Sequence, residues 1–176
     1  RTILYKREDI DVYYWIDGLG VDWVPFIINV IEEYSKENVY LNEVHIAVSS
    51  IPTTTSKNKP VLQSLLPAGE ELSKLGSLDS FAHQHKSYPQ YILDEFQIVR
   101  GAIHNVLDQY NGKKIAFVSD HGVSYLAQYS KGLKLAGLTS DHEGRLAHVT
   151  GKMVLDDKYI ILDDNETVCS LRYPQG

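Results

Sequence analysis

The sequence contains a single cysteine, Cys169, so the chain cannot form an internal disulfide. This fits a reducing compartment, and we expect a cytoplasmic protein. The sequence also lacks any apolar run near the roughly 18 residues that a membrane span needs, and we expect no signal peptide. Cys169 lies in an alternating segment, which indicates a buried or half-buried strand residue rather than a thiol nucleophile.

The sequence also lacks a surplus of basic residues. It has 17 Lys and Arg residues against 23 Asp and Glu residues, so the net charge is −6. Nucleic-acid-binding domains usually carry a basic surplus, although a local basic groove is compatible with an acidic chain. The 43% hydrophobic and 23% charged residues are typical of a globular domain. The chain begins at Arg1 and ends soon after a strand-like segment, so we expect a domain core cut from a longer protein.

Short apolar runs alternate with helical periodicity along most of the chain. The pattern predicts strands at Val12–Ile16, Val44–Ser49 and Lys114–Val118, and helices from Val24 to Tyr34 and from Tyr88 to Tyr110. Asp22 is the expected cap of the first helix, and Pro25 suits its first turn. This alternation predicts an α/β fold with a mostly parallel central sheet flanked by helices.

The C-terminal part has a weaker pattern. Residues 132–150 are predicted to be irregular, and strands are expected at Met153–Leu155, Tyr159–Leu162 and Val168–Tyr173. A turn at residues 163–165 should join the last two strands as a hairpin.

Polar residues follow the predicted strands. Asp17 comes after the first strand, Thr53 to Thr55 after the second, and Asp120 with His121 after the third. Ligands of such sheets gather at the carboxyl ends of the strands, so we expect these groups to meet. Taken singly, Asp17-Gly18 is typical of a turn, and a hydroxyl cluster in a loop commonly caps a helix.

Two Asp–His pairs have metal-ligand character. Asp120 and His121, within Ser119-Asp-His-Gly122, place a carboxylate and an imidazole where a buried strand ends, and zinc binds both types. Asp79 and His83 are spaced four residues apart and would share one face of a helix, where they can hold a metal ion. The alternative for Asp79 and His83 is a solvent-facing pair.

Together, the order of these elements resembles the alkaline phosphatase superfamily, in particular its nucleotide phosphodiesterase branch. Three stretches are similar to PglZ domains, which occur in bacterial phage-defence systems and in some response regulators. They are Trp15-Ile-Asp-Gly-Leu-Gly-Val-Asp-Trp23, Ser50-Ile-Pro-Thr-Thr-Thr55 followed by Asn58-Lys-Pro60, and Leu78-Asp-Ser-Phe-Ala-His83. The resemblance implies one PglZ-like domain with an alkaline phosphatase-like core over residues 1–176.

The resemblance also implies roles for individual residues around two divalent metal ions, with zinc expected and manganese or magnesium compatible with the donors. One ion would be held by Asp17, Asp120 and His121, and the other by Asp79 and His83. Thr55 would be the nucleophile, with Thr54 and Ser56 as rivals. Asn58 would donate a hydrogen bond to a phosphoryl oxygen.

One expected ligand is missing from the pattern. The superfamily supplies a further His to the second ion, usually from a His-Gly motif near the C-terminus of the domain. We expect that residue beyond Gly176, with His142 as the better stand-in and His148 as the weaker one. Full occupancy of the Asp79 and His83 site, and the activity of this chain, depend on that ligand.

These features favour a metal-dependent phosphodiesterase or phosphatase, a hydrolase of phosphoester bonds. The substrate would be a phosphoester such as a nucleotide or DNA, and the partners would be other defence-system or signalling proteins. The alternative is a non-catalytic PglZ-fold scaffold in a phage-defence or regulatory complex. A third hypothesis is a metal-independent α/β binding domain.

Overall fold

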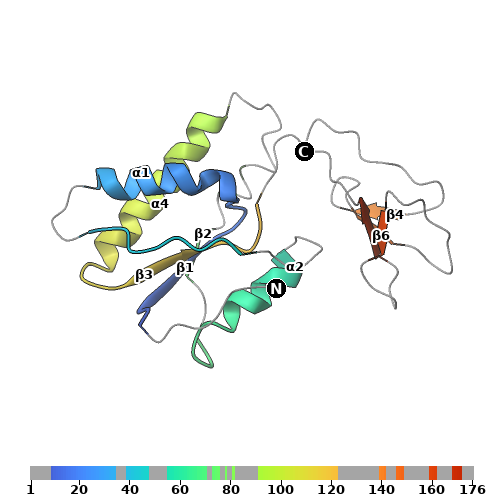
Figure 1. The fold of residues 1–176 in the computed structure, drawn as a ribbon, viewed down its shortest axis with the longest axis horizontal. Helices are drawn as coiled ribbons and strands as arrows, with labels where there is room; N and C mark the ends of the chain where they lie inside the picture. The colour runs from blue at the N-terminus through green and yellow to red at the C-terminus, as the bar shows by residue number, and fades with distance from the viewer. Residues whose placement is uncertain are drawn as a thin grey trace. The chain divides into compact units, whose positions relative to one another are not determined.

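The computed structural model describes part of the chain, in two compact units (Figure 1). The units are Arg1–Val123 and Ser124–Gly176. The described residues are 9–34, 39–47, 55–70, 73–75, 78, 81, 91–122, 139–141, 146–148, 159–161 and 168–171, of which 73–75 and all those from 139 onward are described by their backbone alone. The prediction of one PglZ-like domain over residues 1–176 stays a prediction.

The first unit contains helices and a small parallel sheet, so the α/β class is confirmed. Strand β1 (Val12–Ile16) lies in the centre, with β2 (Ser73–Leu75) on one side and β3 (Ile115–Val118) on the other. Both neighbours run parallel to β1, and Trp15 of β1 lies opposite Val118 of β3. The strands predicted at Val12–Ile16 and Lys114–Val118 are therefore confirmed, the second within one residue.

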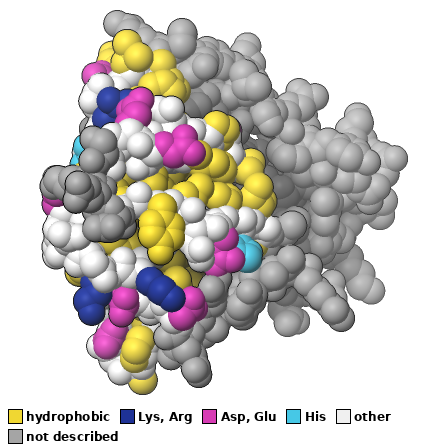
Figure 2. Space-filling view, turned by 60° about the vertical axis from the view of Figure 1, so that its left-hand side comes forward, with side chains coloured by type: hydrophobic (Ala, Val, Ile, Leu, Met, Phe, Trp, Pro, Cys, Tyr) yellow, Lys and Arg dark blue, Asp and Glu magenta, His cyan; other side chains and the backbone are white. Residues whose placement is uncertain are grey.

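The strand predicted at Val44–Ser49 is wrong for its described part. Residues 44–47 carry no strand, and Val44 and Ile46 are 44% and 65% exposed. The two edges of β1 are taken by β2 and β3, so no edge of β1 is left for this segment to pair with. Figure 2 shows apolar side chains at the surface of the described region, interspersed with charged ones.

Alternate side chains of β1 enter two separate hydrophobic clusters. Ile16 joins the cluster formed with α1 (Val24–Glu33) and α4 (Ile92–Gln109). These two helices contribute the buried residues Val30, Ile31, Val99, Ile103 and Leu107. Trp15 joins the cluster that contains Leu62 of α2 (Thr55–Gln63) and Leu65 just after it. Ile16 and Trp15 are 0% and 1% exposed, because a parallel strand is buried on both faces. The helices of the two clusters lie on opposite sides of the strands in Figure 1.

The helix predictions hold in outline. Helix α4 lies within the predicted Tyr88–Tyr110, whose residues 88–90 lie outside the described part, and Gly112 follows its end with φ 76°. Pro25 occupies the first turn of α1, as expected, but the cap prediction is wrong. Asp22 lies inside the 3₁₀ helix η1 (Val21–Trp23), so Trp23 takes the capping position without a side-chain cap. None of the described helices is long and apolar enough to cross a membrane.

The second unit contains an antiparallel sheet of four strands in the order β4-β5-β7-β6. They are β4 (Thr139–Asp141), β5 (Leu146–His148), β6 (Tyr159–Ile161) and β7 (Val168–Leu171). The last two confirm the predicted strands there, and Cys169 lies in β7. The prediction that residues 132–150 are irregular is wrong for the described residues 139–141 and 146–148, because strands of three residues are too short to show a readable alternation. Met153–Leu155 lies outside the described residues.

Candidate metal centre

The register between β1 and β3 brings two acidic residues to the same edge of the sheet. Because Trp15 lies opposite Val118, the residues two positions further along each strand are Asp17 and Asp120. Both strands end at this edge, and each residue is 3% exposed. Parallel strands present their carboxyl ends together, so two carboxylates 103 positions apart in the sequence become neighbours.

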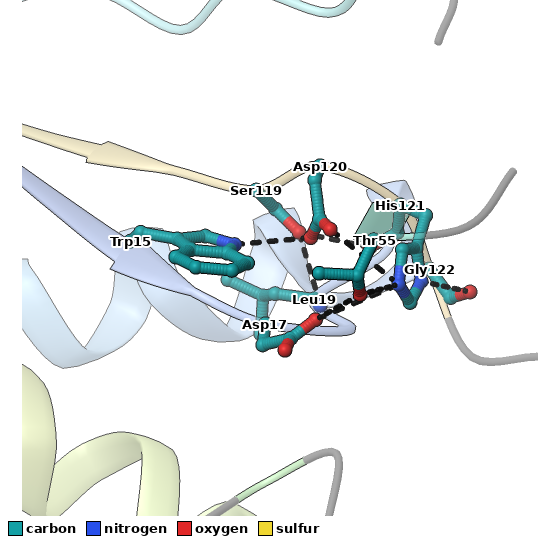
Figure 3. Close-up of polar contacts among 8 residues, drawn as sticks. All are labelled: Trp15, Asp17, Leu19, Thr55, Ser119, Asp120, His121 and Gly122. Atoms are coloured by element: carbon teal, nitrogen blue, oxygen red, sulfur yellow. Dashed lines mark hydrogen bonds and ion pairs between the residues drawn. The ribbon is translucent and has the colours of Figure 1, made fainter. Parts of the chain in front are cut away.

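His121 completes a cluster with these carboxylates (Figure 3). Its Nε2 atom lies 3.5 Å from Asp17 Oδ1 and 3.5 Å from Asp120 Oδ2, and its side chain is 11% exposed. The ligand atoms of the three residues all lie within 4.8 Å of one another. Two acidic oxygens and one imidazole nitrogen therefore converge on a small, nearly buried volume.

The second ring nitrogen of His121 faces the backbone. Nδ1 lies 3.2 Å from the carbonyl oxygen of Gly122, which can only accept a hydrogen bond, so Nδ1 is the donor in this contact. The neutral ring then keeps its lone pair on Nε2, the atom that faces the carboxylates. Metal-binding histidines typically have this arrangement, with the far nitrogen donating to a carbonyl or carboxylate.

Thr55 brings a hydroxyl group to the same point. Its Oγ1 donates to Asp17 Oδ1 at 3.2 Å and lies 3.0 Å from His121 Nε2. Thr55 is the first residue of α2, whereas the rival Ser56 is exposed and Thr54 lies outside the described residues. The hydroxyl therefore lies between one carboxylate oxygen and the imidazole nitrogen of the cluster.

One atom of this cluster is left without a hydrogen bond. Asp120 Oδ2 is buried and has no hydrogen-bond partner among the described residues. A buried carboxylate oxygen is costly unless it is paired with a cation or a donor. A divalent ion at the point where Oδ2, Asp17 and Nε2 converge would satisfy it, and this donor set is one that zinc accepts. The described residues therefore fit a metal ion.

The two loops that carry the ligands are joined by Ser119. The amide of Leu19, in the loop after β1, donates to Ser119 Oγ at 3.1 Å, and the same hydroxyl donates to the carbonyl of His121 at 2.8 Å. Gly18, between Asp17 and Leu19, has φ 80°, a conformation that favours glycine. These contacts hold the Asp17 loop and the Asp120–His121 loop against each other.

The loops also touch through backbone atoms alone. A Cβ added to Gly122 would lie 2.8 Å from the Cα of Gly20 and 3.4 Å from its nitrogen. Backbone atoms at such a distance must move, and the movement would displace His121, the preceding residue. Glycine at position 122 is thus required by the close approach of the two loops.

We therefore expect Gly122→Ala to destabilise the protein by about 1–3 kcal/mol, the usual cost of overpacking a filled site, and to weaken zinc binding. Gly101→Ala is the matched control, since a Cβ there meets nothing within 4 Å. Because Gly101 lies within α4, alanine should stabilise that helix by about 0.5–1 kcal/mol. Urea unfolding and zinc titration of both variants provide the measurement. A Gly122→Ala protein as stable as wild type would contradict the close approach.

Of the residues predicted for the site, the structure brings together Asp17, Thr55, Asp120 and His121. Asn58 is buried at 4% exposure, one turn after Thr55 on α2. Asp79, His83 and His142 lie outside the described residues, so their roles stay predictions.

Two contributors were not assigned a role from the sequence. Ser119 bridges the loops, as described above, and the indole Nε1 of Trp15 donates to Asp120 Oδ1 at 3.0 Å. Trp15 packs in the core, but the strand pattern carries no sign of a hydrogen bond to Asp120.

Comparisons with known proteins return no match, whether against protein-family models, curated proteins or solved structures.

Proposed function

We propose that this protein is a metal-dependent phosphodiesterase or phosphatase that uses Thr55 as its nucleophile. The observation that carries the proposal is the position of Thr55 Oγ1, which lies 3.0 Å from His121 Nε2 and 3.2 Å from Asp17 Oδ1. A hydroxyl needs a neighbouring base or a metal ion to become a good nucleophile at neutral pH. Asp17 is a candidate proton acceptor within hydrogen-bond distance of Thr55, and the hydroxyl lies beside a set of groups that can hold a metal ion.

Asp17, Asp120 and His121 would hold the first ion. When bound, a divalent ion at this position would lower the pKa of a neighbouring hydroxyl and offset the negative charge of a phosphoryl group. Zinc suits the mixture of imidazole and carboxylates, and manganese or magnesium would suit the carboxylates. Asp79 and His83, with His142 or a residue outside this chain, are proposed for a second ion.

The start of α2 adds a second element of the proposal. The amide groups in the first turn of a helix have no partner within the helix and attract phosphate. Thr55 opens α2, so a phosphoryl group within reach of its hydroxyl would also lie beside those amides. Asn58, one turn later, is the proposed donor to a phosphoryl oxygen.

The proposed reaction has two steps. Thr55 Oγ1 attacks phosphorus, its proton passes to a carboxylate oxygen of Asp17, the bond from phosphorus to the leaving oxygen breaks, and the leaving alcohol takes up a proton from Asp17. Water then attacks the phosphothreonine, the bond between phosphorus and Thr55 Oγ1 breaks, and inorganic phosphate or a phosphomonoester leaves. The threonine hydroxyl regains a proton, so the protein returns to its starting state.

Membership of the PglZ domains and an alkaline phosphatase-like core, with a mostly parallel central sheet flanked by helices, remain part of the proposal. They are supported by the parallel sheet of the first unit and by the motif order Asp17, Thr55, Asp120 and His121 at its edge. A cytoplasmic location, a nucleotide or DNA substrate, and partners from defence or signalling systems follow from the same resemblance.

A chromogenic phosphodiester and a phosphomonoester test the proposal. We expect the full-length protein to hydrolyse at least one of them with zinc, manganese or magnesium, because the proposed nucleophile lies beside the proposed ion site. A chelator should abolish turnover, and re-addition of the ion should restore it. Failure to hydrolyse either ester with any of the three ions would contradict the proposal, as would turnover that resists the chelator.

A further inference from the structure

We propose that Trp15 is a positioning residue for the metal centre, where its indole N–H selects the oxygen of Asp120 that faces the ion. This inference rests on the proposed function, because it concerns the same ion site. Trp15 Nε1 donates to Asp120 Oδ1 at 3.0 Å, and both partners are buried (Figure 3). The indole N–H is a donor only, so it holds a carboxylate oxygen and cannot compete as a ligand.

The two oxygens of Asp120 therefore have different environments. Oδ1 is occupied by the indole, whereas Oδ2 lies 3.5 Å from His121 Nε2 and has no hydrogen-bond partner among the described residues. With Oδ1 held, the carboxylate cannot rotate freely and Oδ2 stays directed at the shared volume. A monodentate ligand is therefore oriented before any ion arrives.

The indole itself is firmly held. Trp15 is 1% exposed and packs with Leu62 and Leu65, and Lys59 Nζ lies 5.5 Å from the ring centroid. Leu62 and Lys59 belong to α2, the helix that begins with Thr55. One aromatic ring thus contacts both the helix that carries the nucleophile and the carboxylate that would hold the ion.

Removal of the indole N–H of Trp15 should therefore weaken binding of the ion and leave the fold intact. Loss of a hydrogen-bond partner of a metal ligand typically weakens metal binding by about 10- to 100-fold. We expect that loss for zinc in Trp15→Phe, which keeps an aromatic ring in the core. A second replacement with the same shape is benzothienylalanine, in which sulfur takes the place of the N–H group.

Trp23→Phe is the matched control. Trp23 is 4% exposed and packs edge-on against Phe26 and Phe96 in the other hydrophobic cluster. It undergoes the same chemical change in the other core cluster, whereas the indole hydrogen bond to Asp120 comes from Trp15. Zinc affinity should stay within about threefold of wild type, since no partner of a metal ligand is lost.

Zinc affinity is measured by competition with a chromogenic chelator, and thermal unfolding monitors the fold. The indole N–H signals in NMR provide a separate readout, since the chain has only two tryptophans. The Trp15 signal should move in Asp120→Ala while the Trp23 signal stays in place, which reports the hydrogen bond itself; the loss of zinc affinity in a folded Trp15→Phe protein is the readout that a purely structural role would not produce.

Each outcome has a distinct meaning. Wild-type zinc affinity in a folded Trp15→Phe protein, or in the benzothienylalanine protein if Trp15→Phe does not fold, would overturn this inference alone. A Trp15 signal unchanged by Asp120→Ala would overturn it as well. If the wild-type protein binds no zinc, manganese or magnesium, the proposed function and this inference fail together.

Discussion

Alanine at both position 120 and position 121 should remove the zinc bound by the first site. Asp120 and His121 supply two of the three donors that converge within 4.8 Å, and Asp17 alone is left. Loss of a hydrogen-bond partner of a ligand costs about 10- to 100-fold in affinity, and loss of two ligands should cost more. Metal analysis after dialysis measures the loss.

The control for this variant removes an exposed pair of the same chemical kind. Glu43 and His45 form an ion pair of 2.9 Å, and both side chains are exposed, so Glu43→Ala with His45→Ala should leave the bound zinc unchanged. Asp120→Asn alone should also weaken zinc binding, because it keeps the shape of the side chain and removes its charge. Zinc content equal to wild type in the Asp120 and His121 variant would refute the assignment of these residues as ligands.

Thr55→Ala should reduce turnover of the phosphodiester by about a thousandfold or more, the scale on which hydrolases lose activity with their nucleophile. The variant removes the hydroxyl of Thr55 that contacts Asp17 and His121, and the proposed ligands themselves stay. Zinc affinity and the unfolding midpoint should therefore change little. Steady-state kinetics set beside a zinc titration separate the chemical step from binding of the ion.

Two companion variants sharpen this test. Thr55→Ser keeps a hydroxyl at the start of α2 and should retain measurable turnover, whereas Ser56→Ala removes an exposed hydroxyl from the next position and should behave as wild type. Undiminished turnover in Thr55→Ala would move the nucleophile to Thr54 or Ser56, or indicate a different mechanism.

Periodicity was sufficient to predict the central elements of the first unit. Val12–Ile16 and Ile115–Val118 are short apolar runs with β-branched and aromatic residues, and α4 shows a helical repeat of apolar residues over four turns and more. The site followed from these elements, because residues after neighbouring parallel strands must share an edge. The sequence alone was therefore sufficient to predict that Asp17, Asp120 and His121 lie close together.

The wrong strand prediction and the missed hydrogen bond have a common physical origin. Val44 and Ile46 have strand-like side chains, whereas the strand that pairs with β1 is Ser73–Leu75, which has little strand character. Pairing depends on which segment reaches the free edge of β1, and strand propensity is weaker than that tertiary constraint. The same holds for the hydrogen bond from Trp15 to Asp120, which joins residues 105 positions apart and depends on the register between two strands.

The pairing of β1 with β3 also bears on how the protein would acquire the proposed cation. Asp17 and Asp120 meet only when residues near both ends of the first unit have paired, so the complete set of three donors does not exist in an unfolded chain. An ion that needs all three donors would bind the native state and contribute its binding free energy to that state by mass action. Binding of such an ion would therefore follow closure of the sheet, and a chain whose sheet has not closed would lack it.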